Sequence, residues 1–251
     1  MTASERQTVQ ALLAWQAAMG ADEAIGETPF NCFAPPAAAP SPPRVTPKPK
    51  PASDRGAVSE SVAATTTLAE LEVMVANFDG CALKRTAKRL CFARGNEQAP
   101  IMLIGEAPGR EEDLEGKPFV GPAGHMLDVM LASIGVGEDQ VYISNTVYWR
   151  PPGNRTPTPE EVEACAPFVA RQIELLSPQI LVLLGKAAAQ SVLRVADGIM
   201  RMRGKWLNYT CAGRPIPTLA TLHPAYLLRT PADKRLAWRD LLMLKERLAQ
   251  L

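Results

Sequence analysis

The chain has 251 residues and a mass of 27.1 kDa, with 47% hydrophobic and 21% charged residues. This composition is sufficient for a core-forming domain and excludes a chain that is disordered throughout. Lys and Arg number 27 against 26 Asp and Glu, so the net charge of +1 excludes binding to nucleic acid or membranes by bulk charge, and an anionic partner would need a local basic patch.

Apolar runs and cysteines both indicate a cytoplasmic protein with no membrane contact. No apolar run approaches the roughly eighteen residues of a membrane span, and the first residues lack the apolar core of a signal peptide. The cysteines are odd in number and include no C-x-x-C pair: Cys32, Cys81, Cys91, Cys165 and Cys211. That pattern is typical of free thiols in a reducing compartment, and of neither a disulfide framework nor a simple zinc site.

Residues 1–28 are predicted to hold a short amphipathic helix, and residues 29–60 a linker. Ser4 can cap the helix, and Gly20 can end it. Prolines crowd the linker, a composition that stays extended and buries no core. A short helix on such a tether favours a docking element, and the alternative is a frayed tail.

Residues 61–251 have the sequence pattern of a globular domain in which helices and strands alternate. Short apolar runs predict buried strands at Ile101–Ile104, Val141–Ser144, Ile180–Leu184 and Pro217–Leu222. Helical patterns lie around them, at Leu68–Phe78, Ala123–Ile134, Pro159–Leu176, Lys186–Val195 and Ala232–Leu248. Apolar strands separated by helices predict an α/β domain, a three-layer α/β/α architecture with a central four-stranded parallel sheet.

Polar side chains follow three of the predicted strands. The first strand runs into Gly105–Gly109 with Glu106, the second into Asn145, and the fourth into His223. Because ligands of open parallel sheets bind beyond the carboxyl ends of the strands, these residues are expected to share a site. Each alone could be a helix-start carboxylate, a turn former or a loop histidine.

Signatures of several common enzyme classes are missing. The sequence contains no Gly-x-Ser-x-Gly elbow, no Gly-Lys-Ser/Thr phosphate loop and no zinc-deaminase spacing. The turn Gly105–Gly109 is rich in glycine but is not a G-x-G-x-x-G fingerprint. Acyl transfer and nucleoside-triphosphate chemistry therefore lack support.

A set of motifs between about Leu68 and Leu251 resembles family-4 uracil-DNA glycosylases, in order and in spacing. The motifs are Gly105–Gly109, Glu112-Asp113, Gly116–Gly124, Asn145, Arg150–Pro159, Leu184-Gly185, Arg203–Trp206 and His223–Arg229. The resemblance implies an enzyme that flips uracil out of DNA, cuts its N-glycosidic bond by hydrolysis and leaves an abasic site. Nothing before Leu68 belongs to the motif set.

The resemblance also implies roles for the residues of the site. Gly105, Ala107 and Phe119 would bind the base, with the Phe119 ring stacked on it. Asn145 would read O4 and N3 of uracil through its amide. His223 would donate a hydrogen bond to O2, where negative charge builds as the bond breaks.

The residue expected to activate the attacking water differs from that of related glycosylases. In family-1 relatives the third residue of the equivalent turn is an aspartate, and here it is Ala107. Glu106 is the nearest replacement, and we expect it to position the water or stabilise the oxocarbenium-like transition state. The motifs hold no Schiff-base lysine, and Arg150–Pro159 lacks the insertion of a cross-linking sister group, so neither lyase activity nor covalent capture is expected.

DNA contact is expected from two segments. Tyr226, Leu227 and Leu228 could insert between bases, and Arg229 could meet a phosphate. Basic residues also gather around Trp206, at Arg194, Arg201, Arg203, Lys205 and Arg214, with a solvated charged face as the alternative.

The family's iron–sulfur cluster needs four thiolate ligands, and this chain keeps two of them, Cys81 and Cys165. Phe78 and Trp149 stand at the other two places. We expect no cofactor and no metal, with the two rings filling the vacated volume. Cys91 and Cys211 have no spacing that supports a rescue, although the sequence leaves that open.

The sequence therefore predicts a monofunctional uracil-DNA glycosylase of base-excision repair. It should act on uracil-containing DNA as a monomer, with the N-terminal helix available to a repair or replication protein. Loss of the cluster could also widen the range of damaged bases. The alternatives are a non-catalytic DNA-binding or polymerase-accessory protein on the same fold, and a nucleotide hydrolase using Glu112 and Asp113 with a metal.

Overall fold

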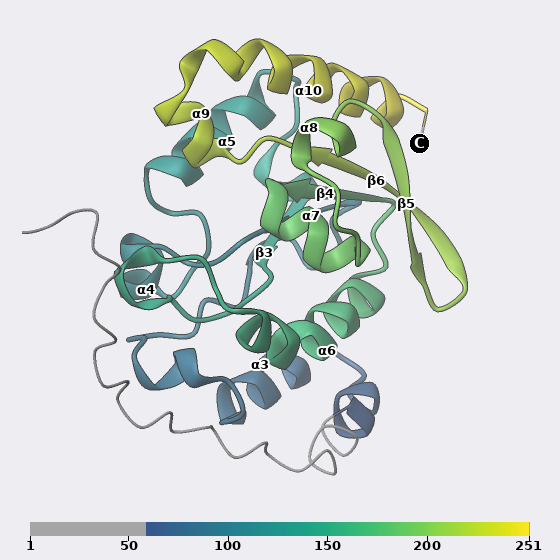
Figure 1. Cartoon of the computed structure of the whole chain (residues 1–251). Coiled ribbons are helices and arrows are strands. Elements are labelled where there is room, and N and C mark those ends of the chain that lie inside the picture. The colour runs from purple at the N-terminus through teal and green to yellow at the C-terminus, as the bar shows by residue number, and fades with distance from the viewer. Residues whose placement is uncertain (1–58, 251) are drawn as a thin grey trace, which may run out of the picture. The chain divides into compact units, whose positions relative to one another are not determined.

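The computed structural model describes residues 59–250, which form three layers with a sheet between two sets of helices (Figure 1). The expected N-terminal helix, and the linker up to residue 58, lie outside the described residues. No helix in residues 59–250 is long and apolar enough to cross a membrane.

The sheet has six strands in the order β1-β3-β2-β4-β6-β5. Their bounds are β1 Arg94–Gly95, β2 Ile101–Gly105, β3 Val141–Asn145, β4 Ile180–Leu184, β5 Trp206–Cys211 and β6 Arg214–Thr221. Neighbours among β3, β2, β4 and β6 are parallel, as predicted, whereas β1 and β5 are antiparallel edge strands. The α/β/α class is confirmed, and the expectation of four strands is corrected to six.

Both missed strands have a physical reason. β1 is only two residues long, too short for a pattern. In β5, Leu207, Tyr209 and Cys211 alternate with exposed residues, a pattern for which the sequence analysis predicts no strand. Strict alternation next to a second apolar run is the signal of a hairpin, and β5 does pair with β6 as one.

The helices cover both faces of the sheet (Figure 1). They are α3 Leu68–Asn77, α4 Arg110–Glu115, α5 Pro122–Ala132, α6 Pro159–Leu176, α7 Lys186–Leu193, α8 Ile199–Met202, α9 Pro224–Arg229 and α10 Lys234–Leu248, with short 3-10 turns at Ala82–Arg85, Glu138–Gln140, Pro152–Asn154 and Pro231–Asp233. Helices α3, α6 and α7 pack on one face of the sheet, and α5, α9 and α10 on the other. Successive residues of each parallel strand point to opposite faces of the sheet and pack in the core on that face. The parallel strands are therefore apolar throughout.

A buried polar network fixes the carboxyl end of β3. The Ser144 hydroxyl lies 2.8 Å from the carbonyl oxygen of Phe92 and 3.1 Å from Oε1 of Gln172. The Gln172 amide, fully buried on α6, also donates to the Tyr142 hydroxyl at 2.9 Å. Because buried polar groups demand partners, this network holds Ser144, and with it the adjacent Asn145, in one position.

Candidate active site

The carboxyl ends of the parallel strands bring the predicted site residues together. Gly105 ends β2, Asn145 ends β3, and the two are paired across the sheet. His223 follows β6, which lies beyond β4 in the same sheet. Phe119 joins them from the loop before α5, with its ring centroid 5.7 Å from that of His223. We call Gly105, Phe119, Asn145 and His223 the strand-end cluster.

Gly105 allows the other members to meet. A Cβ atom on this residue would lie 2.5 Å from Oδ1 of Asn145 and 2.5 Å from Cζ of Phe119. Those distances are far below van der Waals contact, so only glycine fits between the amide and the ring. Gly105, Phe119 and Asn145, which the sequence analysis expects to bind the base, therefore lie side by side at this end of the sheet.

Asn145 carries an unpaired acceptor. The residue is 1% exposed, yet its Oδ1 atom accepts no hydrogen bond from the described residues. A buried polar atom without a partner costs roughly 1–3 kcal/mol and is rare in folded proteins. An acceptor kept at that cost is available to a ligand that presents an N–H group.

His223 is held as a neutral hydrogen-bond donor. It is the N-cap of α9, and its Nδ1 atom accepts from the Ala225 N–H at 3.1 Å. Burial, with the charge of Arg229 as a smaller cause, lowers the pKa of His223 to about 4. Near neutral pH the imidazole is therefore uncharged, and because Nδ1 accepts, its proton is on Nε2.

Gly185 is a member of the site that the sequence reasoning did not assign. Its φ angle is +92°, and a Cβ atom there would lie 2.9 Å from Cβ of His223. Glycine is therefore required for the end of β4 to pass behind the imidazole. The Leu184-Gly185 motif was the available signal.

Glu106 and Ala107 follow Gly105 in a loop that Thr146 holds. The Thr146 hydroxyl donates to the carbonyl oxygen of Glu106 at 2.7 Å, and its N–H donates to that of Gly105 at 2.9 Å. Glu106 is partly exposed next to the strand-end cluster, whereas Ala107 packs against the core. The side chain of Glu106 is therefore accessible beside the strand-end cluster, and its role toward a water molecule stays a prediction.

The carboxylates of Glu112 and Asp113 have structural partners, which contradicts their use as metal ligands of a nucleotide hydrolase. Glu112 accepts from backbone N–H groups of the surrounding loops, and Asp113 accepts from those of Lys88 and Arg89. Within residues 59–250, no three His, Cys, Asp or Glu side chains form a group that could hold a metal ion.

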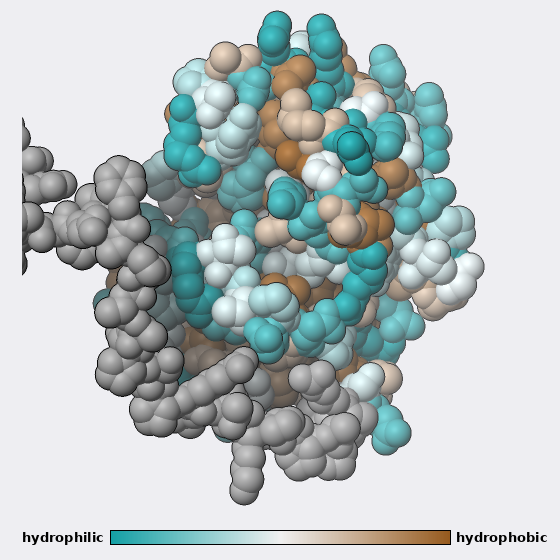
Figure 2. All heavy atoms as spheres, in the orientation of Figure 1, coloured by the Kyte–Doolittle hydropathy of each residue, from teal (hydrophilic) through white to brown (hydrophobic). Residues whose placement is uncertain are grey.

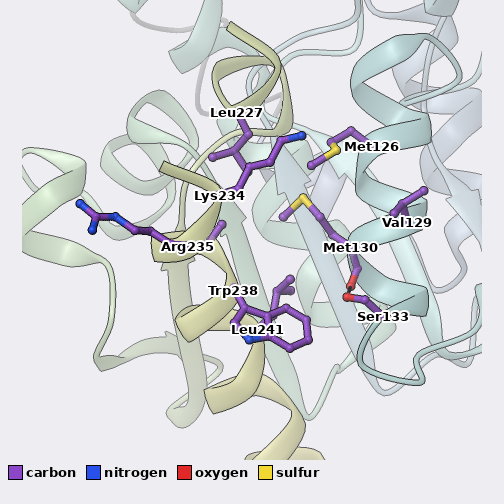
Figure 3. Close-up of a pocket in the computed structure, with 10 residues that line it drawn as sticks. Met126, Val129, Met130, Ser133, Leu227, Lys234, Arg235, Trp238 and Leu241 are labelled. Carbon is purple, nitrogen blue, oxygen red and sulfur yellow. Dashed lines mark hydrogen bonds between the residues drawn. The ribbon is translucent and has the colours of Figure 1, made fainter. Parts of the chain in front are cut away.

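One residue of the predicted DNA wedge is buried inside the domain. Tyr226 to Arg229 form most of α9, where Leu227 is fully buried and Leu228 is 44% exposed. Leu227 lines an apolar groove together with Met126 (Figure 3), and because it is fully buried the prediction that it inserts between bases is wrong. The Tyr226 hydroxyl donates to Asp233 at 2.5 Å, and Arg229 is exposed.

The predicted basic surface is also reduced by the structure. Arg203 turns inward and forms an ion pair with buried Asp240 at 2.7 Å, so it is not available to DNA. Arg194 pairs with Glu163. Lys205 is exposed, as the prediction requires. The error arose because a basic residue in a sequence gives no sign of a buried acid on a distant helix.

An apolar groove of about 350 Å³ lies between α5 and α10, away from the strand-end cluster. Its walls include Met130, Leu227 and Leu241, with Lys234 at one end (Figure 3). Figure 2 shows hydrophobic residues among hydrophilic ones at the top of the view, where α9 and α10 lie. None of Gly105, Asn145 or His223 lines it.

A second group of residues stands at the four positions where the family resemblance implies iron–sulfur ligands. We call these residues, Phe78, Cys81, Trp149 and Cys165, the cysteine corner. All four belong to, or pack against, the same core. The hydrogen bond between the two thiols lowers the pKa of Cys81 and, with burial, raises that of Cys165. The Phe78 ring packs 4.9 Å from that of Phe168. Two thiols paired with each other among apolar rings do not fit a four-thiolate cluster.

The remaining described cysteines lie elsewhere. The Cys91 thiol donates to the carbonyl oxygen of Glu112 at 3.1 Å, and burial raises its pKa to about 12. Cys211 ends β5 at the edge of the sheet. Since no group of three potential ligands exists within the described part of the chain, neither residue completes a site with Cys81 and Cys165.

Known proteins are similar to this chain over most of the described residues. The family model of the uracil DNA glycosylase superfamily matches residues 92–242. A type-4 uracil-DNA glycosylase of Archaeoglobus fulgidus is 45% identical over 155 residues, which are 60% of this chain and 78% of that protein. One of Pyrobaculum aerophilum is 38% identical over 180 residues, 70% of this chain and 92% of that protein. One of Thermotoga maritima is 40% identical over 158 residues, 61% of this chain and 79% of that protein.

Proposed function

Because the chain belongs to the uracil-DNA glycosylase superfamily and is a uracil-DNA glycosylase of DNA repair, we propose that it flips uracil out of DNA before cutting it free. The bond between C1′ and N1 breaks with both electrons going to the base, a water oxygen bonds to C1′ and releases a proton to solvent, and the uracil anion takes up a proton. The products are free uracil and an abasic site. This family membership disfavours the alternative of a non-catalytic DNA-binding or polymerase-accessory protein.

The observation that carries the proposal is the unpaired Oδ1 atom of Asn145. Uracil presents N3–H as a donor and O4 as an acceptor, so the amide of Asn145 can accept from the first and donate to the second. Cytosine has an acceptor at N3 and a donor at N4, the reverse of uracil. In this orientation acceptor would face acceptor and donor would face donor, and the buried amide would form neither hydrogen bond. The Phe119 ring beside Asn145 supplies an apolar face for the base.

His223 stabilises the leaving group in this mechanism. Its Nε2–H group donates to O2 of uracil, where negative charge grows as the bond to C1′ breaks. The lowered pKa of His223 keeps the imidazole neutral, so the residue acts as a hydrogen-bond donor and not as a proton donor. Glu106 orients the water and offsets the positive charge that develops on the sugar.

The reaction is proposed to need no iron–sulfur cluster. The cysteine corner supplies two thiols where a cluster needs four, and none of its residues belongs to the strand-end cluster. Every residue from Asn145 to Trp149 is buried, which fixes this loop by packing. We therefore propose that uracil stays the preferred base. The broader range suggested by cluster loss stays a prediction, which an oligonucleotide containing hypoxanthine would test.

Exposed residues of α9 are proposed to contact DNA as it is bound. Leu228 is placed to insert at the vacated base position, and Arg229 to meet a phosphate. Lys205 adds a further cation. We propose that the protein acts as a monomer, with residues 1–28 left to contact another repair or replication protein.

The test is release of uracil from an oligonucleotide, measured in the presence of a chelator. Wild type is compared with Asn145→Ala and His223→Ala, and an absorbance spectrum of the same sample reports any iron–sulfur band. We expect release by wild type, loss in both variants and no iron–sulfur band. No release from a folded sample would contradict the proposed reaction, and a band that is required for activity would contradict its independence of a cluster.

A further inference from the structure

Glu112 is a buried carboxylate that contacts two loops of the active site. It lies in α4 and is 7% exposed. One oxygen, Oε2, accepts from the Gly109 N–H at 3.0 Å. The other oxygen, Oε1, accepts from the N–H groups of Val120 at 3.1 Å and Gly121 at 2.9 Å. Gly109 ends the turn that holds Glu106, and Val120 directly follows Phe119.

The loop with Phe119 needs such an anchor. Phe119 has a φ angle of +55°, a left-handed conformation that is unfavourable for a residue with a Cβ atom. A conformation of this kind persists only where its surroundings impose it. The N–H groups of the next two residues both point at Glu112. The carboxylate therefore holds the backbone that aims the Phe119 ring at Gly105, Asn145 and His223.

We propose that Glu112 is a positioning residue for base excision. Its carboxylate fixes the Phe119 loop and the Glu106 turn in their positions relative to each other. It does not touch the base, and the inference rests on the proposed function. Three N–H donors on two oxygens require a side chain that only accepts. Glutamine has nearly the same shape but would turn an NH₂ group toward one of the loops, which releases either Gly109 or the pair after Phe119.

Asp113 provides a matched control. It is the next residue in α4 and also buried, and its carboxylate also accepts from backbone N–H groups. Its partners are the backbone N–H groups of Lys88 and Arg89 and, at 3.9 Å, the Arg150 guanidinium, and none of them belongs to the Glu106 turn or the Phe119 loop. Asp113→Asn therefore repeats the chemical change of Glu112→Gln without altering those two loops. Exposed Glu111→Gln controls for loss of charge from the first turn of α4.

The test compares full-length wild type, Glu112→Gln, Asp113→Asn and Glu111→Gln. Three quantities are measured: the single-turnover rate of uracil excision, inhibition by free uracil, and affinity for uracil-free duplex. For Glu112→Gln we expect the excision rate to fall by about 10- to 100-fold, the cost of a small misplacement. Inhibition by free uracil should weaken in parallel, while duplex affinity stays unchanged. Both controls should excise at close to the wild-type rate.

A double-mutant cycle separates positioning from a general loss of stability. If Glu112 acts through the ring, then Glu112→Gln adds little to the loss already caused by Phe119→Ala. Full additivity of the two losses would overturn the proposal, and so would a folded Glu112→Gln variant that excises at the wild-type rate. A wild type that releases no uracil would instead overturn the proposed function itself.

A second variant covers the case in which Glu112→Gln does not fold. Glu112→Asp keeps the charge but is one methylene shorter, so it cannot reach both loops. It should show the same selective loss of excision and of inhibition by uracil. If neither variant folds, the carboxylate serves folding as a whole, and the positioning role is rejected.

Discussion

The strand-end cluster and the cysteine corner lie in the same domain but have opposite local character. The strand-end cluster holds a buried oxygen without a partner, and a phenylalanine with a positive φ angle. In the cysteine corner the thiols hydrogen-bond to each other, and the rings pack in the core. The first keeps features that cost stability, whereas the second contributes to it by packing. The comparison indicates that one domain combines a region held by packing with a region that keeps polar and backbone features that packing alone would not favour.

The largest expected effect is on stability, from the cysteine corner. Trp149→Ala should lower the free energy of unfolding by about 3–5 kcal/mol, because it leaves a large cavity in the core. The folded fraction should keep most of its excision rate. Urea unfolding followed by circular dichroism, with a uracil release assay on the same sample, measures both. Trp238→Ala, at a side chain 44% exposed, is the control and should cost far less.

The strand-end cluster should respond in the opposite way. Asn145→Ala should slow uracil excision by about 10²- to 10³-fold, since a buried reading group is lost. The free energy of unfolding should change by less than about 1 kcal/mol, because the deleted oxygen has no partner in the free protein. Single-turnover kinetics and thermal melts measure the two effects, with exposed Asn208→Ala as the control. If Asn145→Ala lost stability as well as activity, the strand-end cluster would not differ from the cysteine corner in this respect.

The pH dependence of stability tests His223. Its pKa is about 4 in the folded protein against an ordinary value of 6.5, so between these values the unfolded chain binds more protons. Stability should therefore fall as the pH drops from 6.5 to 4, by up to about 3 kcal/mol, and show no further loss from this group below pH 4. His223→Gln should lack this component. Equal pH profiles for wild type and the variant would show that the imidazole is not buried in neutral form.

The smallest expected effect is at Leu228, outside both regions. Leu228→Ala should slow excision from duplex DNA by about tenfold, because a wedge offsets part of the cost of unstacking. Excision from single-stranded DNA should change less. Leu242→Ala, another exposed leucine, on α10, is the control and should affect neither substrate. An equal loss on both substrates would remove Leu228 from the proposed wedge.

Much of the fold and of the strand-end cluster could be predicted from the sequence. The strands β2 and β4 and the helix α6 have strong patterns, and parallel topology brings their carboxyl ends together. Asn145 and His223 could be predicted because Asn145 ends the apolar run of β3 and His223 comes just after that of β6. Gly185 and Thr146 were missed because their roles depend on close approach and on a hydrogen bond across two strands.

The errors have a common physical origin. The inward turn of Arg203 depends on Asp240, which lies 37 positions later in the chain. The burial of Leu227 depends on which side of a six-residue helix faces α5. Both are properties of tertiary contacts, which a local sequence pattern does not contain.

The ion pair between Arg203 and Asp240 connects helix α10 to the segment before β5 and helps to hold the carboxyl end of the sheet in place. Asp240 on α10 also accepts from the Thr221 hydroxyl at 2.7 Å, two residues before His223. A stop codon before Lys234 would therefore remove more than the packing of one helix. It would leave the Arg203 guanidinium without its carboxylate partner. It would also remove the hydrogen bond between Asp240 and Thr221 at the end of β6. Truncation at this terminus should impair the chemistry as well as the fold, although no residue of α10 belongs to the strand-end cluster.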